Sequence, residues 1–398
     1  MSVKTLTLFE IAEINPSLGV SLDETDEVSF VPMGAFSEVT ASVVAEETRQ
    51  FGQVKKGFTG FRSGDVIFAK ITPCFENGKI GLANISRDVG FGSTEFHVIR
   101  ARPEMADPRF LHHFLRLGSV RLSGTKRMTG SAGQRRVPKS FLESLPVPAL
   151  PLDEQRRIAA MLDKAEELRA KRRAAIALLD QLPQAIFLEM FGDGVPLKSL
   201  SELAELKRGP FGGALKKEFF VESGFKVYEQ GNVIADDFEF GNYFIDEGRF
   251  SKMRGFEIAP DDLLVSCSGT LGRIAQVPRN AAPGLINQAL LRLRVRNDQM
   301  RPTFLRLALQ SHAVQQVLAG FSRGSGLQNF PPMSEVRSLL IPAPDLHAQD
   351  KFIVRVEQIA GIRAAYQSVL DESYALFASL QARAFSGQFS DTKELSHA

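Results

Sequence analysis

The chain has 398 residues, of which 44% are hydrophobic and 24% charged, with a formal net charge of +2. This length holds two or three cores, and the composition is that of an ordinary globular protein. The two cysteines, Cys74 and Cys267, lack zinc-ligand spacing, the first residues lack the apolar core of a signal peptide, and no apolar run is long enough for a membrane span. We therefore expect a cytoplasmic protein that does not enter a membrane.

The first block of the chain predicts a mixed α/β domain. Residues 1 to about 27 predict a strand and a helix. From Val28 onward, β-branched and aromatic residues alternate between glycines, a pattern typical of strands and turns. A helix follows at 107–115, where Asp107 is a suitable N-cap and Pro108 suits the first turn.

The second half repeats the first in the same order. LTLFEIAEI near the start corresponds to LKSLSELAEL, and DPRFLHHFL at 107–115 corresponds to RPTFLRLAL at 301–309. The loop 130–134 corresponds to 324–328, and the offset stays at about 195 residues. A repeat this long indicates two copies of a domain rather than a solenoid, whose repeats have about 20–50 residues.

A long helical stretch ends each block, at 145–193 and at 340–389. Each begins with a Pro-x-Pro entry and then carries apolar residues at three- and four-residue steps, as in a coiled-coil pair. Helices of about 30–38 residues are about 45–57 Å long, so we expect them to pair antiparallel. The alternative is that each covers its own domain. The residues expected to pair are Ile158, Leu162, Leu168, Ile176, Leu179, Val356, Ile359, Ile362, Val369 and Leu376.

Basic residues gather in the same part of each half. Between Arg100 and Lys139 there are ten Lys and Arg against two acids, and between Arg292 and Arg337 seven Arg against two acids. A basic face repeated in both copies is expected of a protein that binds a phosphate backbone. A solvated charged surface is the competing interpretation.

The chain shows no catalytic constellation. His112 and His113 are adjacent on a predicted helix and so point apart, and none of the six histidines has metal-ligand spacing with cysteines or carboxylates. There is no G-x-x-x-x-G-K-[ST] phosphate loop. We therefore expect no catalytic residue, no metal site and no cofactor in this chain.

The central stretch carries a family resemblance. It reads PVPALPLDEQRRIAAMLDKA from Pro146, followed by LRAKRR and IFLEMFGD, and GDVI, ITPCFENGK and GSTEF are supporting matches. On these motifs the chain resembles the specificity (S) subunit of a Type I restriction-modification enzyme over nearly its full length. The second copy departs from the pattern, because EQR becomes AQD and only Gln155 and Gln349 correspond.

The resemblance implies an α+β fold in which two similar mixed α/β target-recognition domains are joined by two long helices pairing as an antiparallel coiled coil. It implies a non-catalytic subunit that binds a bipartite target in double-stranded DNA and docks two methyltransferase (modification) subunits. Restriction/translocase subunits join that assembly, which serves DNA methylation and phage defence. S-adenosylmethionine, ATP and Mg would belong to the partner subunits.

The expected division has five segments. They are a first target-recognition domain at 1–150, a central helical spacer at 151–193, a second target-recognition domain at 194–344, a C-terminal helical spacer at 345–389 and a disordered tail at 390–398.

The residues expected to meet DNA lie in loops, where Lys and Arg contact phosphates and polar side chains reach base edges. In the first domain they are Lys70, Thr72, Asn77, Lys79, Lys126, Arg127, Gln134, Arg135 and Arg136. In the second domain they are Lys207, Arg208, Lys216, Lys217, Arg254, Ser268, Arg273, Arg323 and Gln328. For each of them, a solvated charge or a turn residue is the competing interpretation.

Two other functions are compatible with the same residues. One is a helical adaptor or scaffold whose globular domains bind proteins. The other is the specificity subunit of a related system whose partner combines methyltransferase and nuclease in one chain. The DNA target and the length of its spacer do not follow from the sequence, because base contacts depend on loop conformation.

Overall fold

The computed structural model describes residues 4–131, 133–192, 194–296, 298–318 and 330–386. The chain divides into two compact units. The first unit comprises residues 1–175 and 366–398, and the second unit comprises 176–365. The predicted domain boundaries stay predictions, and the predicted disordered tail at 390–398 lies outside the described residues.

The first unit contains two larger sheets and a two-stranded ribbon. The strand orders are β2-β11-β8-β9-β5-β4, β6-β3-β10-β7 and β1-β12. All neighbours are antiparallel except β3 with β10 and β5 with β9. The strands are β1 (Thr5–Thr7), β2 (Ala12–Ile14), β3 (Glu27–Val31), β4 (Phe36–Ser37), β5 (Ser42–Val43), β6 (Glu47–Gln50), β7 (Thr59–Arg62), β8 (Val66–Ala69), β9 (Ile80–Leu82), β10 (Val89–Gly92), β11 (Phe96–Ala101) and β12 (Pro146–Pro148).

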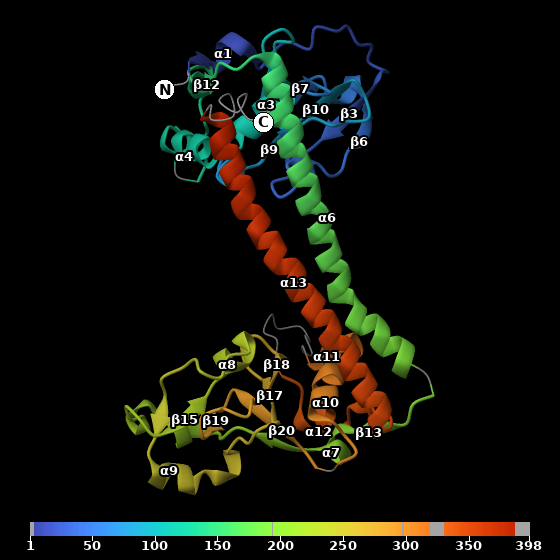
Figure 1. Cartoon of the computed structure of the whole chain (residues 1–398), viewed down its shortest axis with the longest axis vertical. Helices are drawn as coiled ribbons and strands as arrows, with labels where there is room; N and C mark the ends of the chain where they lie inside the picture. The colour runs from blue at the N-terminus through green and yellow to red at the C-terminus, as the bar shows by residue number, and fades with distance from the viewer. Residues whose placement is uncertain (1–3, 132, 193, 297, 319–329, 387–398) are drawn as a thin grey trace, which may run out of the picture. The chain divides into compact units, whose positions relative to one another are not determined.

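Helices from both ends of the chain complete the core of the first unit. The short ones are α1 (Leu8–Ile11), η1 (Met33–Ala35), α2 (Phe51–Val54), α3 (Pro108–Leu115), α4 (Gly118–Lys126) and α5 (Lys139–Glu143). The Asp107 carboxylate accepts hydrogen bonds from the backbone of Arg109 and Phe110, which confirms it as the N-cap of α3. The two long helices, α6 (Leu152–Phe191) and α13 (Leu346–Phe385), are drawn green and red in Figure 1. Ile158 and Leu162 of α6 and Phe377 of α13 lie in this core.

The second unit has the same kinds of layers. Its strand orders are β14-β20-β17-β18, β16-β15-β19 and β13-β21. The strands are β13 (Leu197–Ser199), β14 (Ala204–Arg208), β15 (Phe225–Tyr228), β16 (Phe244–Ile245), β17 (Leu263–Ser266), β18 (Ile274–Gln276), β19 (Gly284–Ile286), β20 (Leu290–Val295) and β21 (Leu340–Pro342). The helices are α7 (Leu200–Leu203), η2 (Gly212–Leu215), η3 (Lys217–Phe219), α8 (Gln230–Ala235), α9 (Glu247–Lys252), η4 (Arg254–Phe256), α10 (Pro302–Leu309), α11 (His312–Leu318) and α12 (Met333–Ser338).

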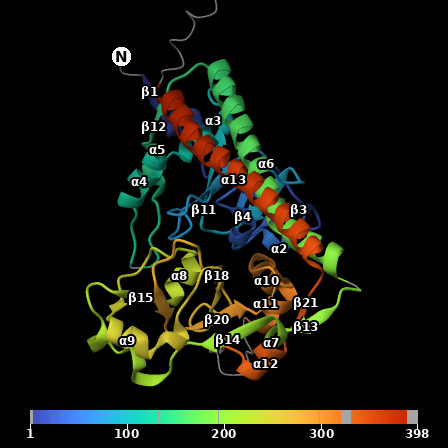
Figure 2. The same ribbon diagram turned by 60° about the horizontal axis from the view of Figure 1, so that its bottom comes forward.

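Aromatic packing anchors the long helices in the second unit. Helix α10 packs beside β18, as Figure 2 shows. Its Phe304 meets Phe187 and Phe191 of α6 and Phe352 of α13, with ring centroids 5.2 to 6.3 Å apart. Such ring contacts add about 0.5–1.5 kcal/mol each beyond the burial of area.

The predicted fold class is confirmed, because the two units share their order of elements. In each, a capping box starts the first short helix, at Thr7 and at Ser199. In each, a short ribbon joins the opening strand to the strand before the long helix, and that helix has 40 residues. The internal repeat seen in the sequence is therefore a repeat of architecture.

One glutamine ties each long helix to its own unit. The Gln155 side chain accepts from the backbone nitrogen of Asp107 at 3.1 Å and donates to the carbonyls of Met105 and Leu150 at 3.0 and 2.9 Å. Both copies bury the side chain, which is 3% exposed at Gln155 and 0% at Gln349. The amide therefore satisfies three backbone groups that would otherwise be buried without partners.

The second glutamine repeats this arrangement. Gln349 accepts from the backbone nitrogen of Arg301 at 2.8 Å and donates to the carbonyls of Gln299 and Pro344, each at 2.8 Å. The two glutamines are the residues that the sequence comparison of the long helices matched, and the structure supplies the physical reason for the match.

The two long helices contact each other within both units. In the first unit, Arg173 of α6 donates to the hydroxyl of Tyr374 of α13 at 3.1 Å. In the second unit, Asp180 accepts from Arg363, and further along α6 Phe187 meets Phe352 with ring centroids 5.6 Å apart. Residue numbers rise along one helix as they fall along the other, so the segments run antiparallel.

Several of the predicted pairing residues do not lie in a buried seam. Ile158, Leu162 and Ile176 are buried, and Leu179, Val356 and Ile359 are half-buried. The exposed ones are Leu168 at 43%, Ile362 at 49%, Val369 at 42% and Leu376 at 60%. For these four the predicted packing was wrong.

In the terminal helix, the buried face is shifted by one residue from the predicted one. Leu370, Phe377 and Ala384 are buried at a seven-residue spacing, one position after the predicted Val369 and Leu376. A shift of one residue turns a helical stripe by about 100°. The phase was hard to predict because the buried contacts include Arg169, whose guanidinium lies 4.2 Å from the Tyr374 ring centroid and 4.3 Å from that of Phe377.

Among the described residues, one helix, α6, is long and apolar enough to cross a membrane by length and composition alone. Its most apolar window has a mean hydropathy of 1.3, and 17% of that window is buried inside the protein. A single helix of this kind is weak support for a membrane span, and Phe187 and Phe191 of α6 are both used in the core of the second unit.

Replacement of the buried glutamine is expected to destabilise the first unit. Gln155→Ala leaves one backbone donor and two acceptors unsatisfied, which costs about 2–3 kcal/mol of unfolding free energy. Urea denaturation followed by circular dichroism measures this loss. Gln181→Ala, at an exposed position of the same helix, is the matched control and should change stability by less than about 0.5 kcal/mol. Equal effects of the two substitutions would contradict the assigned role.

Candidate nucleic-acid interface

Two loops of the first unit carry all nine candidate DNA-contacting residues except the pair at the end of α4. One loop connects β8 to β9 and runs from Lys70 to Lys79. The other is the hairpin 128–137. The Thr72 hydroxyl donates to Gly133 O and accepts from Arg135 N, both at 3.2 Å, so the two loops form one structure.

The guanidinium groups in these loops are held by carboxylates. Arg136 makes two hydrogen bonds to Glu95, at 2.7 and 2.9 Å, and Arg135 makes one to Glu76 at 3.0 Å. The Lys79 ammonium donates to Met33 O at 3.0 Å, and its side chain is only 13% exposed. Lys79 therefore has a structural contact that the sequence did not indicate.

The exposed candidates of the first unit are found at the loop tips and at the end of α4. Asn77 and Gln134 are exposed at the tips, and Lys126 and Arg127 are exposed at the end of α4. Lys70 and Thr72 are half-buried. The exposed side chains of this surface could therefore contact a ligand through both amide and cationic groups.

The corresponding connection of the second unit carries the second set of candidates. Ser268 and Arg273 are exposed on the turn between β17 and β18, as Lys70 to Lys79 lie between β8 and β9. Arg208, at the end of β14, donates to Cys267 O at 3.5 Å and lies over the ring of Phe330 at 5.2 Å. The candidates therefore gather at the same edge of the sheet in both copies.

The remaining candidates of the second unit are more scattered. Lys207 lies over the ring of Phe256 at 5.0 Å, next to Arg254 in η4. Lys216 lies 3.6 Å from Glu218, and Lys217 is exposed. Arg323 and Gln328 fall outside the described residues. None of the candidate contacts to DNA is tested by the structure, and they stay predictions.

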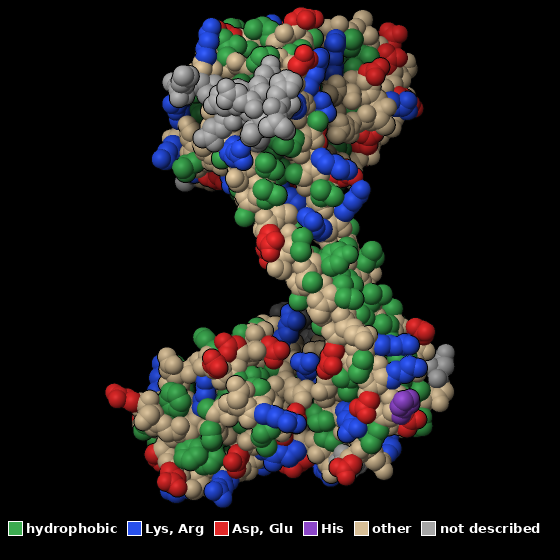
Figure 3. Space-filling view, viewed as in Figure 1, with side chains coloured by type: hydrophobic (Ala, Val, Ile, Leu, Met, Phe, Trp, Pro, Cys, Tyr) green, Lys and Arg blue, Asp and Glu red, His purple; other side chains and the backbone are tan. Residues whose placement is uncertain are grey.

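Carboxylates pair with many of the Lys and Arg side chains in the two basic stretches of the sequence. Six of the ten Lys and Arg between Arg100 and Lys139 form ion pairs, namely Arg100, Arg102, Arg109, Arg135, Arg136 and Lys139. In the second run Arg292, Arg294, Arg301 and Arg306 do so. Figure 3 shows the result, since Lys and Arg lie intermixed with Asp and Glu on the visible face. The charge excess in sequence therefore overstates the positive surface.

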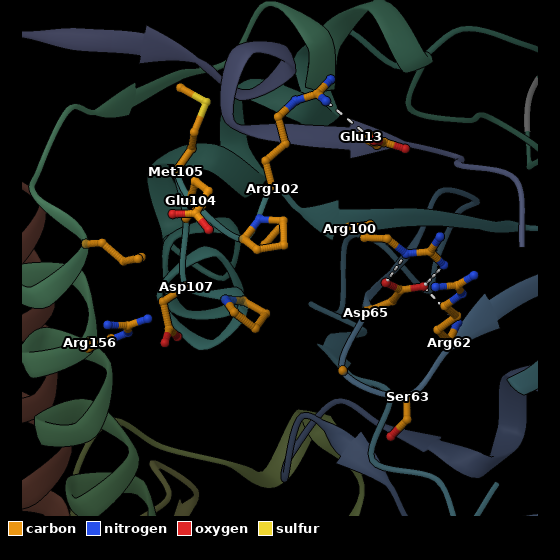
Figure 4. Close-up of a pocket in the computed structure, with 16 residues that line it drawn as sticks. Glu13, Arg62, Ser63, Asp65, Arg100, Arg102, Glu104, Met105, Asp107 and Arg156 are labelled. Carbon is orange, nitrogen blue, oxygen red and sulfur yellow. Dashed lines mark hydrogen bonds and ion pairs between the residues drawn. The ribbon is translucent and has the colours of Figure 1, made fainter. Parts of the chain in front are cut away.

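A cavity of about 670 Å³ lies at the opposite end of strand β8, and sequence reasoning did not predict it. Figure 4 shows Asp65 held by two hydrogen bonds from Arg100, at 2.7 and 2.9 Å, with Arg62 beside them. Asp262 is held in the same way by Arg294, at 2.7 and 2.8 Å. Asp65 is 4% exposed and Asp262 is 1% exposed, so these repeated pairs serve the architecture of each copy.

His97 connects the sheet to the hairpin. Its Nε2 lies 3.0 Å from Val137 O and its Nδ1 lies 3.1 Å from the amide nitrogen of Asn15. A neutral ring fits both contacts, because Nε2 donates to the carbonyl and Nδ1 accepts from the amide. Burial lowers the pKa of His97, an effect that the hydrogen bond to Val137 partly offsets and that Lys70 and Lys139 reinforce.

Comparison with known proteins agrees with this architecture. Residues 2–178 match the family described as Type I restriction modification DNA specificity domain. The chain is 44% identical over 153 residues to the Type I restriction enzyme EcoAI specificity subunit of Escherichia coli, and 44% over 162 residues to the EcoEI specificity subunit of the same species. These alignments cover 38% and 40% of this chain but 26% and 27% of the relatives, about a quarter of their length.

Solved structures extend the similarity of fold to nearly the whole chain. A chain from a study of complex assembly and conformational transition of the type I R-M system has a TM-score of 0.63 at 19% identity, with 96% of this chain and 97% of that one covered. The S subunit of a Type I restriction-modification system from M. genitalium has a TM-score of 0.52 at 16% identity, with 96% of both chains covered. Residues 2–178 therefore match a Type I specificity domain, and the chain as a whole is similar in fold to these solved structures.

Stability should fall as the pH drops below about 6.5. The unfolded imidazole takes up a proton near that pH, whereas the lowered pKa of folded His97 moves its protonation to lower pH, so the unfolded state binds more protons in between. His97→Gln should reduce the loss of unfolding free energy between pH 7.5 and 5.5, measured by urea denaturation. His347→Gln, at an exposed position, is the control and should leave the loss unchanged. An unaltered pH dependence in His97→Gln would refute the assignment.

Proposed function

We propose that this protein is the non-catalytic DNA sequence-recognition subunit of a Type I restriction-modification complex, and that each unit reads one half of a bipartite target. The observation that carries the proposal is the repeat of the candidate loops at the β8–β9 and β17–β18 connections of two similar units. The specificity domain matched at residues 2–178 supports the same function.

The exposed loop residues divide naturally between two tasks. Lys126 and Arg127 would neutralise phosphates, which gives affinity without sequence preference. Asn77 and Gln134 would reach base edges, because an amide presents a donor and an acceptor together. Two hydrogen bonds to Glu95 orient the Arg136 guanidinium before any ligand binds.

The long helices would dock the partner subunits. Large apolar side chains are exposed on their surfaces in both units, among them Leu178 and Leu188 of α6 and Tyr374 and Leu376 of α13. Figure 3 shows exposed hydrophobic side chains on the visible part of these helices. Exposed apolar surface of this kind marks a site of protein association.

The partners would supply the chemistry. Two methyltransferase subunits, one for each repeat, would bring S-adenosylmethionine, and restriction/translocase subunits would bring ATP and Mg. The site of action would be the cytoplasm, where the DNA and the partners meet. A partner that combines methyltransferase and nuclease in one chain would use the same helices.

An adaptor that binds proteins through its globular units is the second candidate. The ion pairing of the basic runs and the exposed apolar helices favour it. The two functions differ in one measurement, the affinity of the purified chain with its methyltransferase for duplex DNA. The specificity function requires binding at low salt that weakens linearly in log salt. Absence of any salt-dependent binding would favour the adaptor.

Neutralising the exposed cations after α4 should weaken DNA binding in a diagnostic way. Lys126→Gln with Arg127→Gln should lower affinity for all duplexes alike and reduce the slope of log affinity against log salt by about one per contact. Fluorescence anisotropy at several salt concentrations measures both quantities. Lys164→Gln, whose ammonium is paired with Glu167 on α6, is the control and should leave the slope unchanged. A loss confined to one sequence would instead assign Lys126 or Arg127 to base recognition.

The paired helices are expected to set the gap in the target. Inserting four residues into α6 after Ala175 and four into α13 after Ala365 adds about one turn, or about 5.4 Å, to both. The gap should then grow by one or two base pairs, since base pairs are stacked about 3.4 Å apart. Sequencing of the host methylome before and after the change reads the gap directly. A continuous methylated motif, or an unchanged gap, would rule out this role of the helices.

A further inference from the structure

A second cavity of the first unit, about 210 Å³ in volume, lies between α3, α6 and the sheet. Helices α3 and α6 are neighbours here, since His113 Nε2 lies 2.8 Å from the Asp163 carboxylate. The sheet side contributes Ser42 and Asn84. The volume is many times the minimum of about 10–15 Å³ that one water needs. A small molecular group therefore fits.

Three arginines surround one glutamate at this cavity. Glu166 accepts a hydrogen bond from Arg169 at 3.0 Å, and its other oxygen lies 3.6 Å from Arg173. Arg116 of the α3 C-terminus faces the same carboxylate. The cluster therefore carries three positive charges against one negative charge.

The other two acids that line the cavity are already neutralised. Asp163 contacts His113 and also lies 3.4 Å from Arg109. Glu167 lies 2.8 Å from Lys164 and 2.6 Å from Lys171, and hydrogen bonds from these lysines lower its pKa to about 2. The positive excess of the arginine cluster therefore remains uncompensated.

Polar nitrogens of the lining residues are buried without a hydrogen-bond partner in the part of the chain that the structure describes. They are Nη1 of Arg116, Nη2 of Arg173, Nδ1 of His113 and both ring nitrogens of His112. His112 is 7% exposed and lines the cavity. The unpartnered atoms also include one acceptor oxygen, Oε1 of Glu166, and a neutral imidazole has one donor and one acceptor nitrogen. Buried polar atoms without partners are rare in folded proteins unless a water, ion or ligand completes them.

The arginines are fixed in place before any ligand binds. The Arg169 guanidinium lies over the rings of Tyr374 and Phe377 of α13, and Arg173 donates its other terminal nitrogen to the Tyr374 hydroxyl. Burial lowers the pKa of Arg116, Glu166 partly offsets this, and the nearby Arg169 and Arg173 lower the pKa further. A bound anion would relieve this repulsion and satisfy the free donors together.

We propose that this cavity binds a phosphate-type oxyanion, held by Arg116 and Arg173 with His112 as an additional donor. The anion would bridge α3 to α6, so its binding would stiffen the junction between the globular part of the first unit and its long helix. The oxyanion would be either free phosphate or a phosphate of the DNA backbone, since both present the same oxygens.

Inorganic phosphate is the probe, added to the full-length chain at constant ionic strength. Isothermal titration calorimetry should show saturable binding, and the thermal transition should rise with phosphate in the same concentration range. Arg116→Gln and Arg173→Gln should each weaken binding by about tenfold or more, because each removes a charge-assisted hydrogen bond. Glu166→Gln should strengthen binding, because it removes the one negative charge of the cluster.

Arg172→Gln is the matched control, because Arg172 lies next to Arg173 on α6 but outside the lining of the cavity. It should bind phosphate as the unmodified chain does. The proposal is overturned if the unmodified chain shows no saturable binding, or if Arg116→Gln and Arg173→Gln respond to phosphate as it does. It is also overturned if Arg172→Gln loses binding equally.

Duplex DNA distinguishes the two sources of the anion. If the backbone supplies it, Arg116→Gln lowers DNA affinity, and phosphate competes with DNA in the unmodified chain. If free phosphate is the ligand, DNA affinity is the same with and without the substitution. A third outcome is that the unmodified chain does not bind phosphate, whereas Arg116→Gln abolishes binding of a protein partner. The cavity would then bind a carboxylate of that partner, which also overturns the proposal.

Discussion

The architecture depends on how each long helix is fastened to the domain that precedes it. One attachment that both copies share is a glutamine, Gln155 or Gln349, whose amide bonds to three backbone groups in the loops around the helix start. Backbone groups at such a junction are buried and need partners, and a primary amide supplies an acceptor and two donors in one rigid plane. This requirement explains why these two residues correspond in helices that otherwise diverged.

Other ties have been kept in both copies for comparable reasons. Asp65 with Arg100 and Asp262 with Arg294 form the same two-bonded pair at one end of each sheet. Removing one partner of such a pair would leave a buried charge, which is far more costly than losing the pair as a whole. The ends of the sheets with these pairs are therefore constrained, whereas Asn77, Gln134, Ser268 and Arg273 are exposed at the opposite ends.

The sequence predicted the features that depend on local pattern. The N-cap Asp107 and the long helices follow from residues close in the chain, the antiparallel pairing follows from the length of those helices, and the structure has all three. The sequence-based prediction failed where contacts between residues far apart in the chain determine which side chains are buried. Val369 and Leu376 were placed in the seam, but Leu370 and Phe377 are the buried residues, and Arg169 of the other long helix lies over the rings of Tyr374 and Phe377.

The basic runs show the same limit. Arg100 and Arg136 look available in sequence, yet Asp65 and Glu95 neutralise them from other strands and loops. Lys79 is likewise occupied by Met33 O across the unit. Which cations remain exposed is a property of the folded chain, and Lys126 and Arg127 are among the exposed cations of the first unit.

The core of the first unit has a consequence for how the protein is made. Phe377 and Ala384 are buried in it, and Phe385 packs on Phe110 with ring centroids 5.1 Å apart. During synthesis the ribosome therefore releases the N-terminal domain long before the residues that complete its core exist. The core of that domain therefore stays incomplete until nearly the entire remaining chain has been synthesised. Its contacts between residues far apart in sequence form late. The half of the molecule that is translated first is thus expected to be the last to mature.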